Sequence, residues 1–357
     1  MLVGIITIID RNNYGNRLQN YALNYYCNHY LKISTQNLDN NPYFNNKKHL
    51  FYRKVKQSGK DLIKNLIRYD KTKKLSNREK NFLEFDKLIP YAKKRVDASS
   101  SLKKYDYLIV GSDQVWNPSF HRLSDVDVLK KIPGHKKISY AASFGMNSIK
   151  NQENILDGIA NFKALSVREE KGKEILEEIT GRKDIEVHID PTLLLTREEW
   201  DKLIKKPSVL PKKKYILCFF LGNLSKERNE EIKRVAKEKN YDIIYLHDKK
   251  SPYYESGPKE FLYFIKNASL ICTDSYHASI FSFLYNLPFV IFKRDQEEFP
   301  DMSSRIDTFI KRFGLQNQKV NGKKITEENL HQDYSKAYQY LEEERKKSRI
   351  YLEKNLK

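Results

Sequence analysis

Short apolar segments alternate with amphipathic segments along almost the whole chain. The apolar segments predict strands at residues 2–8, 105–111, 137–143, 164–168, 215–221, 241–247, 269–273 and 288–292. Stretches with helical spacing lie between most of them, at residues 151–162, 168–179, 226–239 and 257–268. This alternation is typical of parallel sheets covered by helices. It predicts the α/β class, with two doubly wound, Rossmann-like domains.

The predicted strands fall into two groups, separated by the segment KKPSVLPKKK at residues 205–214, which resembles a linker. We therefore expect an N-terminal domain over 1–210 and a C-terminal domain over 211–330. Residues 331–357 predict a charged helix that packs back on the first domain. In doubly wound sheets, ligands bind at the carboxyl ends of the strands. Polar residues directly after strands are therefore the candidates for a site in a cleft between the domains.

The composition adds a strong positive charge. The chain has 66 Lys and Arg against 46 Asp and Glu, a net charge of +20, and residues 47–104 alone hold 19 basic and 6 acidic residues. Apolar residues at helical spacing within this basic insertion predict an amphipathic helix: Phe51, Val55, Leu62 and Leu66. Such a helix can lie on an anionic membrane, contact a polyanion or form a solvated face over a core. Nucleic acid is not indicated, because no binding motif or zinc spacing accompanies the charge.

Three cysteines in apolar segments resemble reduced, buried thiols, and neither a disulfide framework nor a metal site is indicated. The N-terminus runs directly into a strand without a basic leader, and no apolar run reaches the ~20 residues of a membrane span. We expect a soluble, cytoplasmic protein, with the inner face of the membrane as an alternative location. No cofactor or metal is expected.

The first two polar clusters follow the strands at 2–8 and 105–111. In DRNNYGNRLQNYAL (10–23), Asn16 and Arg17 are candidate ligand contacts, although Asn and Gly are also ordinary in a capped strand-to-helix turn. The pattern is not GxGxxG, so a dinucleotide is not indicated. In LIVGSDQVWNPSF, Asp113 is a candidate general base. Its neighbours suit the polar edges and apolar face of a sugar, unless the Trp fills the core: Gln114, Trp116 and Asn117.

Two further clusters lie between residues 139 and 172. In SYAASFG (139–145), small residues allow the backbone to approach either a ligand or a neighbouring helix. Arg168 closes a strand, where its guanidinium can bind a carboxylate or phosphate, or form a salt bridge to Glu169 or Glu170. The Asp-Pro-Thr of HIDPTLLL (188–195) suits a helix cap or the cleft wall, and we assign it no catalytic role.

The last cluster lies within ICTDSYHASIFSFLYNLPFVIF (271–292). Ser275 and His277 fall at the start of a predicted helix, where free N–H groups and the helix dipole favour anions. Cations follow near the next strand end: Lys293, Arg294 and Arg305. One His and three cations suit a compact polyanion, with His277 placed to move a proton.

Taken together, these motifs resemble the polysaccharide pyruvyl transferase family. The resemblance covers residues 4 to about 313 and is carried by NNYGNRLQNYAL, GSDQVWNP, SYAASFG, SVRE, DPTLLL and TDSYHASIFSFLYNLPFVIF, in this order. It implies a fold similar to that of GT-B glycosyltransferases. It also implies phosphoenolpyruvate as the donor and, as the acceptor, a sugar of a cell-surface polysaccharide or its lipid-linked precursor.

This chemistry assigns roles to the candidate residues. His277 would donate a proton or contact the phosphate, and Asp113 would accept the proton of the acceptor. Arg168, Lys293 and Arg305 would hold the two anionic groups of the donor. The chain departs from better-known members at Ser275-Tyr276-His277, where these have Arg-Leu-His, so either Arg305 or Lys293 replaces that cation or the donor site differs. The alternatives are a nucleotide-sugar glycosyltransferase and a non-catalytic scaffold at a membrane surface.

Overall fold

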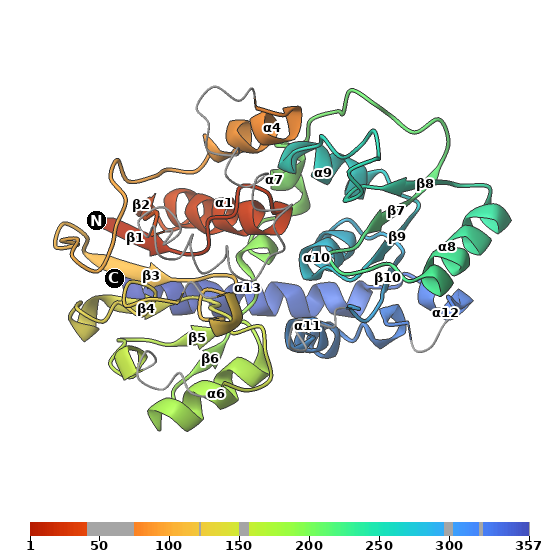
Figure 1. Cartoon of the computed structure of the whole chain (residues 1–357). Coiled ribbons are helices and arrows are strands. Elements are labelled where there is room, and N and C mark those ends of the chain that lie inside the picture. The colour runs from red at the N-terminus through yellow and green to blue at the C-terminus, as the bar shows by residue number, and fades with distance from the viewer. Residues whose placement is uncertain (41–74, 121–122, 150–156, 296–302, 321–323, 357) are drawn as a thin grey trace, which may run out of the picture.

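The computed structural model describes residues 1–40, 75–120, 123–149, 157–295, 303–320 and 324–356. Its N-terminal half is built on a parallel sheet in the order β2-β1-β3-β4 (Figure 1). The strands are β1 (Leu2–Ile6), β2 (Ser34–Asn37), β3 (Tyr107–Val110) and β4 (Lys137–Ser139). A short parallel pair, β5 (Ser166–Val167) and β6 (Glu186–Val187), lies beside β4 and is joined to it through isolated bridges.

The second sheet is also parallel, in the order β10-β9-β7-β8. It contains β7 (Tyr215–Phe219), β8 (Asp242–Tyr245), β9 (Leu270–Thr273) and β10 (Phe289–Ile291). All eight predicted strands are therefore confirmed, as are the parallel pairing and the two doubly wound sheets. The sequence missed β2 and β6, because β2 (STQN) is polar and β6 has only two residues.

Helices cover the sheets and connect their strands. The longer ones are α1 (Tyr14–His29), α4 (Asn77–Asp86), α6 (Glu170–Thr180), α8 (Lys226–Lys239), α9 (Pro258–Lys266), α10 (Tyr276–Leu284), α11 (Ser304–Phe313) and α13 (Ser335–Leu356). Short pieces are η4 (Asp157–Ile159), η5 (Pro191–Leu193), α7 (Arg197–Asp201) and α12 (Glu327–Leu330). The predicted helices 168–179, 226–239 and 257–268 correspond to α6, α8 and α9. Half of the predicted helix at 151–162 lies outside the described residues, and the described half forms only the short η4 instead of a helix of that length. The apolar stripe of the basic insertion also lies outside the described residues.

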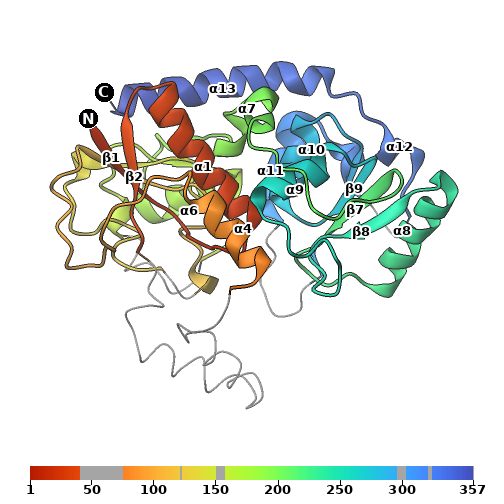
Figure 2. The same cartoon turned by 90° about the horizontal axis from the view of Figure 1, so that it is seen from above.

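The last helix, α13, runs along both domains (Figure 2). It is fixed to the first domain by Tyr351, whose hydroxyl donates to the Ser139 carbonyl at 2.8 Å. His188 packs beside the Tyr351 ring and lies 3.2 Å from the hydroxyl of Ser348. Burial, with smaller effects from nearby cations of Arg312 and Lys347, lowers the pKa of His188 to about 4. The docked helix therefore favours a neutral His188.

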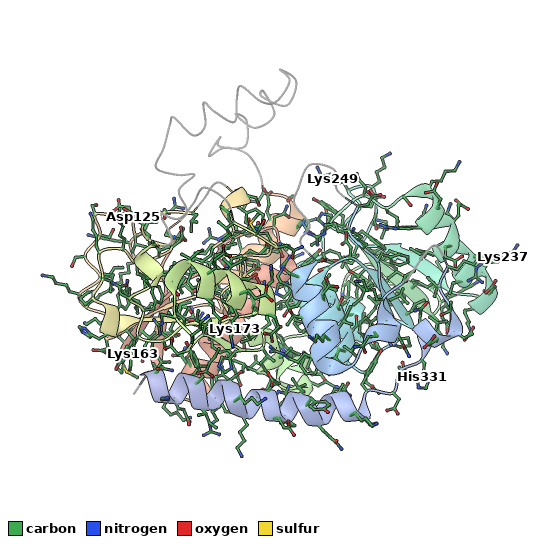
Figure 3. The ribbon with its side chains drawn as sticks, turned by 90° about the horizontal axis from the view of Figure 1, so that it is seen from below. Asp125, Lys163, Lys173, Lys237, Lys249 and His331 are labelled. Carbon is green, nitrogen blue, oxygen red and sulfur yellow. The ribbon has the colours of Figure 1, made fainter. Side chains whose placement is uncertain are left out.

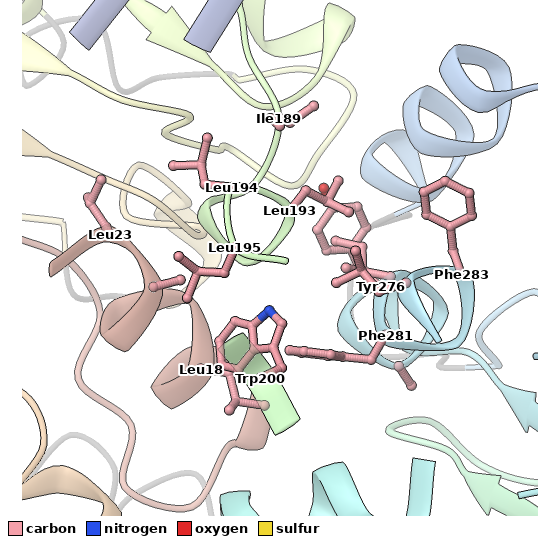
Figure 4. Packing of buried hydrophobic residues seen from close by; sticks show 14 of the residues in the cluster. Leu18, Leu23, Ile189, Leu193, Leu194, Leu195, Trp200, Tyr276, Phe281 and Phe283 are labelled. Atoms are coloured by element: carbon pink, nitrogen blue, oxygen red, sulfur yellow. The ribbon is translucent and has the colours of Figure 1, made fainter. Parts of the chain in front are cut away.

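A continuous apolar cluster joins the two domains (Figure 4). It includes Leu18 from α1, Trp200 from α7 and Phe281 from α10, and the Trp200 and Phe281 rings meet edge to face with centroids 5.0 Å apart. Tyr14 of α1 stacks on Phe261 of α9 at 4.7 Å. An interface of this apolar character resists relative domain motion. It fixes the edge at which the two sheets meet.

The outer faces of both domains carry charged side chains, including Lys173 of α6 and Lys237 of α8 (Figure 3). The three cysteines are buried and free, as expected. Within the described ranges, no helix combines the length and apolar character needed to cross a membrane.

Candidate functional site

In each sheet, the order of the strands reverses at one point along the sheet, and a ligand can bind there. The connections from β1 and β3 diverge to opposite sides, and ligands bind at such switch points. The segments after these strands are joined by two hydrogen bonds. The Thr7 hydroxyl donates to the Ser112 carbonyl at 2.7 Å, and the Asn16 amide donates to Asp113 at 2.9 Å. Asn16 and Asp113 thus lie together at the switch point, although they are 97 residues apart.

The second sheet has its switch point between β7 and β9. Asp274, directly after β9, accepts backbone hydrogen bonds from Leu221 at 2.7 Å and Gly222 at 2.8 Å, which follow β7. Ser275 then caps α10 by accepting from the amide of Ala278. The predicted helix start at Ser275 is confirmed, and it directs the N-terminus of α10 toward the first domain.

The edges formed by the carboxyl ends of the strands in the two sheets meet at His277. A Cβ added to Gly15, in the first turn of α1, would lie 2.1 Å from His277 Nδ1, so the ring packs directly on that glycine. Gly15 is needed for this close approach, whereas the sequence suggested a tight turn. On its other side, His277 Nε2 lies 3.6 Å from Asp190 Oδ2, beyond hydrogen-bond distance. The Nε2 atom is buried without a partner.

Arg168 connects the carboxylates of this cluster. Its guanidinium lies 2.5 Å from Asp190 and 3.2 Å from Asp113, and its side chain is fully buried. Its central carbon also lies 4.6 Å from the centre of the Tyr276 ring. Burial opposes the charge, but the carboxylates, led by Asp190, raise the pKa of Arg168 above its ordinary value. Neither Glu169 nor Glu170 is its partner, so the salt bridge considered from the sequence is replaced by two longer-range pairs.

The two carboxylates are held ionised by their neighbours. Burial alone would raise the pKa of Asp113, but surrounding positive charges, led by Arg168, lower the pKa to about 2. The same opposition, with His277 and Arg168 outweighing burial, holds the pKa of Asp190 well below its usual range. Asp113 also has a positive φ of 70°, a conformation that costs energy for a residue with a side chain. Both groups are acceptors at neutral pH.

Arg305 enters the cluster from the first turn of α11. Its two terminal nitrogens lie 3.0 and 3.1 Å from the Gln114 side-chain amide group, and its central carbon lies 5.7 Å from the centre of the Tyr276 ring. Over the described residues, no carboxylate lies within ion-pair distance of Arg305. Burial and the nearby Arg168 lower the pKa of Arg305 to about 10. This guanidinium therefore favours an additional anion.

Buried polar atoms without a partner gather in the same region. Of twelve such atoms in the described part of the chain, five belong to this cluster: Arg168 Nε, Glu169 Oε2, His277 Nε2, Ser304 Oγ and Arg305 Nε. Proteins satisfy nearly all buried polar groups, with protein, water or ligand partners. Their concentration at one place is expected of a site that binds a polar molecule.

A pocket of about 280 Å³ adjoins this cluster beside the ends of β9 and β10. Its polar lining consists of Asp274, Lys293, Arg294, Ser303, Arg305, Asp307 and Lys319, and its apolar lining of Ile291, Phe292 and Ile306. Lys319 pairs with Asp307 at 2.9 Å, and Arg294 lies 3.4 Å from Asp274. Lys293 and Arg305 have no such carboxylate among the described residues. Counted over the described residues, two cations of the pocket therefore have no compensating carboxylate, and this arrangement suits a small dianion.

Three residues predicted to contact a ligand are instead buried and bind other parts of the fold. Arg17 is fully buried and pairs with Asp86 at 2.7 Å, which joins α1 to α4. Trp116 is also fully buried, and its indole donates to the Asp127 carbonyl at 2.9 Å, so its ring fills the core and presents no face to a sugar. Asn117 is buried, and its side-chain nitrogen lies 2.6 Å from the side-chain amide group of Gln114. The other predicted residues lie in the cluster, at its cap or in the pocket.

The sequence missed the contribution of Asp190 and Glu169. Asp190 caps η5, as predicted for the Asp-Pro-Thr segment, but it also pairs with Arg168. Its position three residues after the end of β6 could have revealed this, had so short a strand been recognised. Glu169 accepts from the Ser143 hydroxyl and from the backbone of Phe144 and Gly145, at 2.8 to 3.1 Å. The small residues of SYAASFG therefore hold a neighbouring carboxylate.

No group of three or more potential His, Cys, Asp or Glu metal ligands occurs in the part of the chain that the structure describes.

The fold and the site define a two-domain α/β protein of the GT-B class, with its candidate ligand groups where the carboxyl edges of two doubly wound sheets meet. The family model for polysaccharide pyruvyl transferases matches residues 13–296, most of the chain. The chain belongs to the polysaccharide pyruvyl transferase family, whose name describes transferases that act on polysaccharides.

Comparison with solved structures agrees on the fold. A proposed UDP-N-acetylglucosamine 2-epimerase from Listeria monocytogenes is similar with a TM-score of 0.52 at 12% identity, over 97% of this chain and 90% of that one. Others include UDP-GlcNAc 2-epimerase from Neisseria meningitidis (TM-score 0.46, 11% identity, 97% and 93% covered). A glycosyltransferase from Rickettsia africae has a TM-score of 0.46 at 11% identity, with 99% and 93% covered. No curated protein matches the chain significantly.

Proposed function

We propose that this protein transfers the pyruvyl group of phosphoenolpyruvate onto two hydroxyls of a sugar, forming a ketal and releasing phosphate. Membership of the family supports the reaction class. The observation that carries the choice of donor is the pocket beside the His277 cluster, in which Lys293 and Arg305 have no carboxylate partner among the residues that the structure describes. Phosphoenolpyruvate has a carboxylate and a phosphate on three carbons, so it needs several cations close together.

The donor binds with its anionic groups toward the pocket. Lys293 and Arg305 supply the uncompensated charge, and Arg294 is a further donor at the same wall. Arg305 adjoins both the pocket and the carboxylate cluster, so an anion on it lies next to the reacting groups. A buried cation such as Arg305 stabilises the charge that develops on a departing phosphate.

Arg305 also accounts for the departure at residue 275. The chain has Ser275 there, and its hydroxyl is used to cap α10. Arg305 places a guanidinium against Tyr276, the next residue, from a different helix. We assign to Arg305 the anion contact that an Arg at position 275 supplies in better-known members, with Lys293 as a second, exposed cation.

His277 is the proton donor of the first step. In its protonated form it gives its Nε2 proton to the methylene carbon of the donor, which becomes a methyl group and makes C2 electrophilic. The first sugar hydroxyl adds to C2, and its proton passes to Asp113. A pKa of about 2 makes Asp113 a weak base, but a hydroxyl bonding to an electron-poor carbon becomes acidic enough for such a base.

The second step closes the ketal. The bond from C2 to the phosphate oxygen breaks, and the phosphate leaves with the proton held by Asp113. The second hydroxyl then adds to C2 and gives its proton to the neutral His277, which restores the starting state. The balance is one donor and one diol in, and one ketal and one hydrogen phosphate out.

The acceptor is a glycan or a lipid-linked sugar precursor, at the inner face of the membrane in the second case. The excess of basic residues over 47–104 supports a lipid-linked acceptor, since each Lys or Arg near an anionic leaflet contributes about 1 kcal/mol. Replacing the basic residues of 47–74 with Ser tests this. The apparent KM should then rise for a lipid-linked acceptor and remain unchanged for a short soluble one.

The reaction is tested by measuring phosphate release from phosphoenolpyruvate with galactosyl, glucosyl and mannosyl acceptors, soluble and lipid-linked. We expect acceptor-dependent release and a product heavier by one pyruvate ketal. His277→Ala should lower the rate of transfer by about 10²–10⁴-fold, whereas the matched change at the exposed His331 should have no effect. Wild-type turnover by the His277→Ala protein would exclude the role of His277.

One observation favours a second function. A pocket with two uncompensated cations also suits the diphosphate of a nucleotide-sugar, which a glycosyltransferase would use. Thermal-shift measurements with uridine diphosphate, guanosine diphosphate and phosphoenolpyruvate separate the two functions. Stabilisation by a nucleoside diphosphate alone, with no phosphate release in the acceptor panel, would favour the glycosyltransferase.

A further inference from the structure

Asp190 lies between the main groups of the cluster, yet no step above uses it. Its carboxylate is fully buried, and Oδ1 accepts from the backbone and hydroxyl of Thr192 at 2.9 and 2.7 Å. Oδ2 faces the other way, where Arg168 donates at 2.5 Å and His277 Nε2 lies at 3.6 Å. Because each oxygen has its own fixed partners, the carboxylate cannot rotate away from His277.

The ring of His277 is confined from the opposite side. Gly15 packs against Nδ1, so the ring is held between α1 and the start of η5, with Nε2 toward Asp190. The other charged groups around this point are Asp113 after β3, Arg168 after β5 and Arg305 on α11. Arg168 pairs with both carboxylates, at 2.5 Å from Asp190 and at 3.2 Å from Asp113. Asp190 is thus the carboxylate whose distance to His277 the structure fixes most directly.

We propose that Asp190 is a positioning residue for the transfer reaction, which orients the His277 ring and stabilises its protonated form through the ionised Oδ2. The proposal rests on the proposed function. A carboxylate within ~4–6 Å of an imidazole stabilises the protonated ring. Only the protonated ring can give a proton to the donor's methylene carbon. At 3.6 Å the Nε2 proton is not bound tightly by Asp190, so it stays available to the donor.

The test is the pH dependence of kcat for the Asp190→Asn protein, with wild-type and Ser112→Ala proteins alongside. Asp190→Asn keeps the size of the side chain and removes its charge. We expect kcat to fall and the pH above which kcat declines to move to a lower value. Ser112 donates to the same oxygen at 3.3 Å without altering its charge, so Ser112→Ala should leave that pH unchanged.

A double-mutant cycle separates an effect through His277 from an effect through Arg168. If Asp190 acts through the imidazole, Asp190→Asn should lower kcat strongly in the wild-type background and by less than about twofold in a His277→Gln background. The proposal would be overturned if the loss of kcat in the double variant equalled the product of the losses in the two single variants. It would also be overturned if Asp190→Asn did not shift the dependence of kcat on pH.

Asp190→Asn also removes a buried partner of Arg168, so the folding of each variant is checked by thermal unfolding. If the Asp190→Asn protein does not fold, Asp190→Glu tests the proposal in its place, because it keeps the charge and displaces the carboxylate by one methylene. A reduced kcat with the pH profile in its wild-type position is then expected, and a wild-type kcat would overturn the proposal. Absence of transfer by the wild-type protein would instead refute the proposed function, and this inference with it.

Discussion

Replacing Gly15 with Ala tests whether the position of the His277 ring sets the rate. An added Cβ would lie 2.1 Å from Nδ1 and 2.2 Å from Cγ of the ring, whereas ordinary contacts begin near 3.4 Å. The ring must therefore move by more than about 1 Å. A misplacement of that size costs an enzyme on the order of 100-fold in rate. We expect kcat for phosphate release to fall by about that factor.

The substitution should not unfold the protein. Ala is favoured over Gly within a helix by about 1 kcal/mol, which offsets part of the roughly 1–3 kcal/mol that crowding costs in a packed core. Gly172→Ala is the matched control, since Gly172 also lies in the first turn of a helix and its nearest atoms would be at 3.4 Å. It should keep wild-type kcat with an equal or higher melting temperature.

The assay is acceptor-dependent phosphate release, with thermal unfolding of both variants. A folded Gly15→Ala protein with wild-type kcat would refute the argument, because the ring would then tolerate a displacement that the geometry makes unavoidable. An equal loss in Gly172→Ala would also refute it, since that loss could not arise from His277.

Three further outcomes are expected. Arg305→Met should lower kcat/KM for phosphoenolpyruvate roughly 10–100-fold, while the melting temperature stays equal or rises, because a buried cation without a carboxylate partner is removed from beside Arg168. Lys293→Gln should raise KM for phosphoenolpyruvate several-fold at low salt and less at high salt, and the exposed control Lys237→Gln should change neither. His188 has a pKa lowered to about 4, so the unfolded chain binds its proton more tightly and stability falls as the pH drops from about 6.5 through 4. Between pH 7 and pH 4.5, the free energy of unfolding measured in urea should fall by about 2–3 kcal/mol less in His188→Gln than in the wild-type protein. An equal fall in both proteins would refute the assignment.

The fold was predictable because buried strands of a parallel sheet are apolar on both faces. Most of the strands that the sequence identified are of this kind, such as β9 (Leu270–Thr273), which is buried throughout. The edge strand β2 (Ser34–Asn37) carries Ser, Thr, Gln and Asn, and its first residue is exposed. Its assignment depends on pairing with β1, which no local pattern encodes.

The sequence predicted where along the chain the site residues lie better than it predicted which way their side chains point. His277, Arg168 and Asp113 were identifiable because each lies after a strand, where doubly wound sheets gather their ligands. The direction of the Trp116 side chain was not predictable, since a residue in the segment after Asp113 can face either the cleft or the core. In the structure, its indole donates a hydrogen bond within the core. The partners of Arg168 are 55 and 22 residues away, and only the packing of several strand ends brings them together.

The apolar junction of the domains has a consequence for how the site works. Trp200 and Phe281 close a continuous core between the domains, and the close packing of Gly15 on His277 lies at the same junction. A large opening would expose this core, at about 25 cal/mol for each Å² of apolar surface uncovered. The cluster is therefore held in one arrangement before any donor binds. Preorganised charges stabilise a transition state without reorganising during the reaction, and the unpartnered atoms around Arg305 are what such a site presents to its donor.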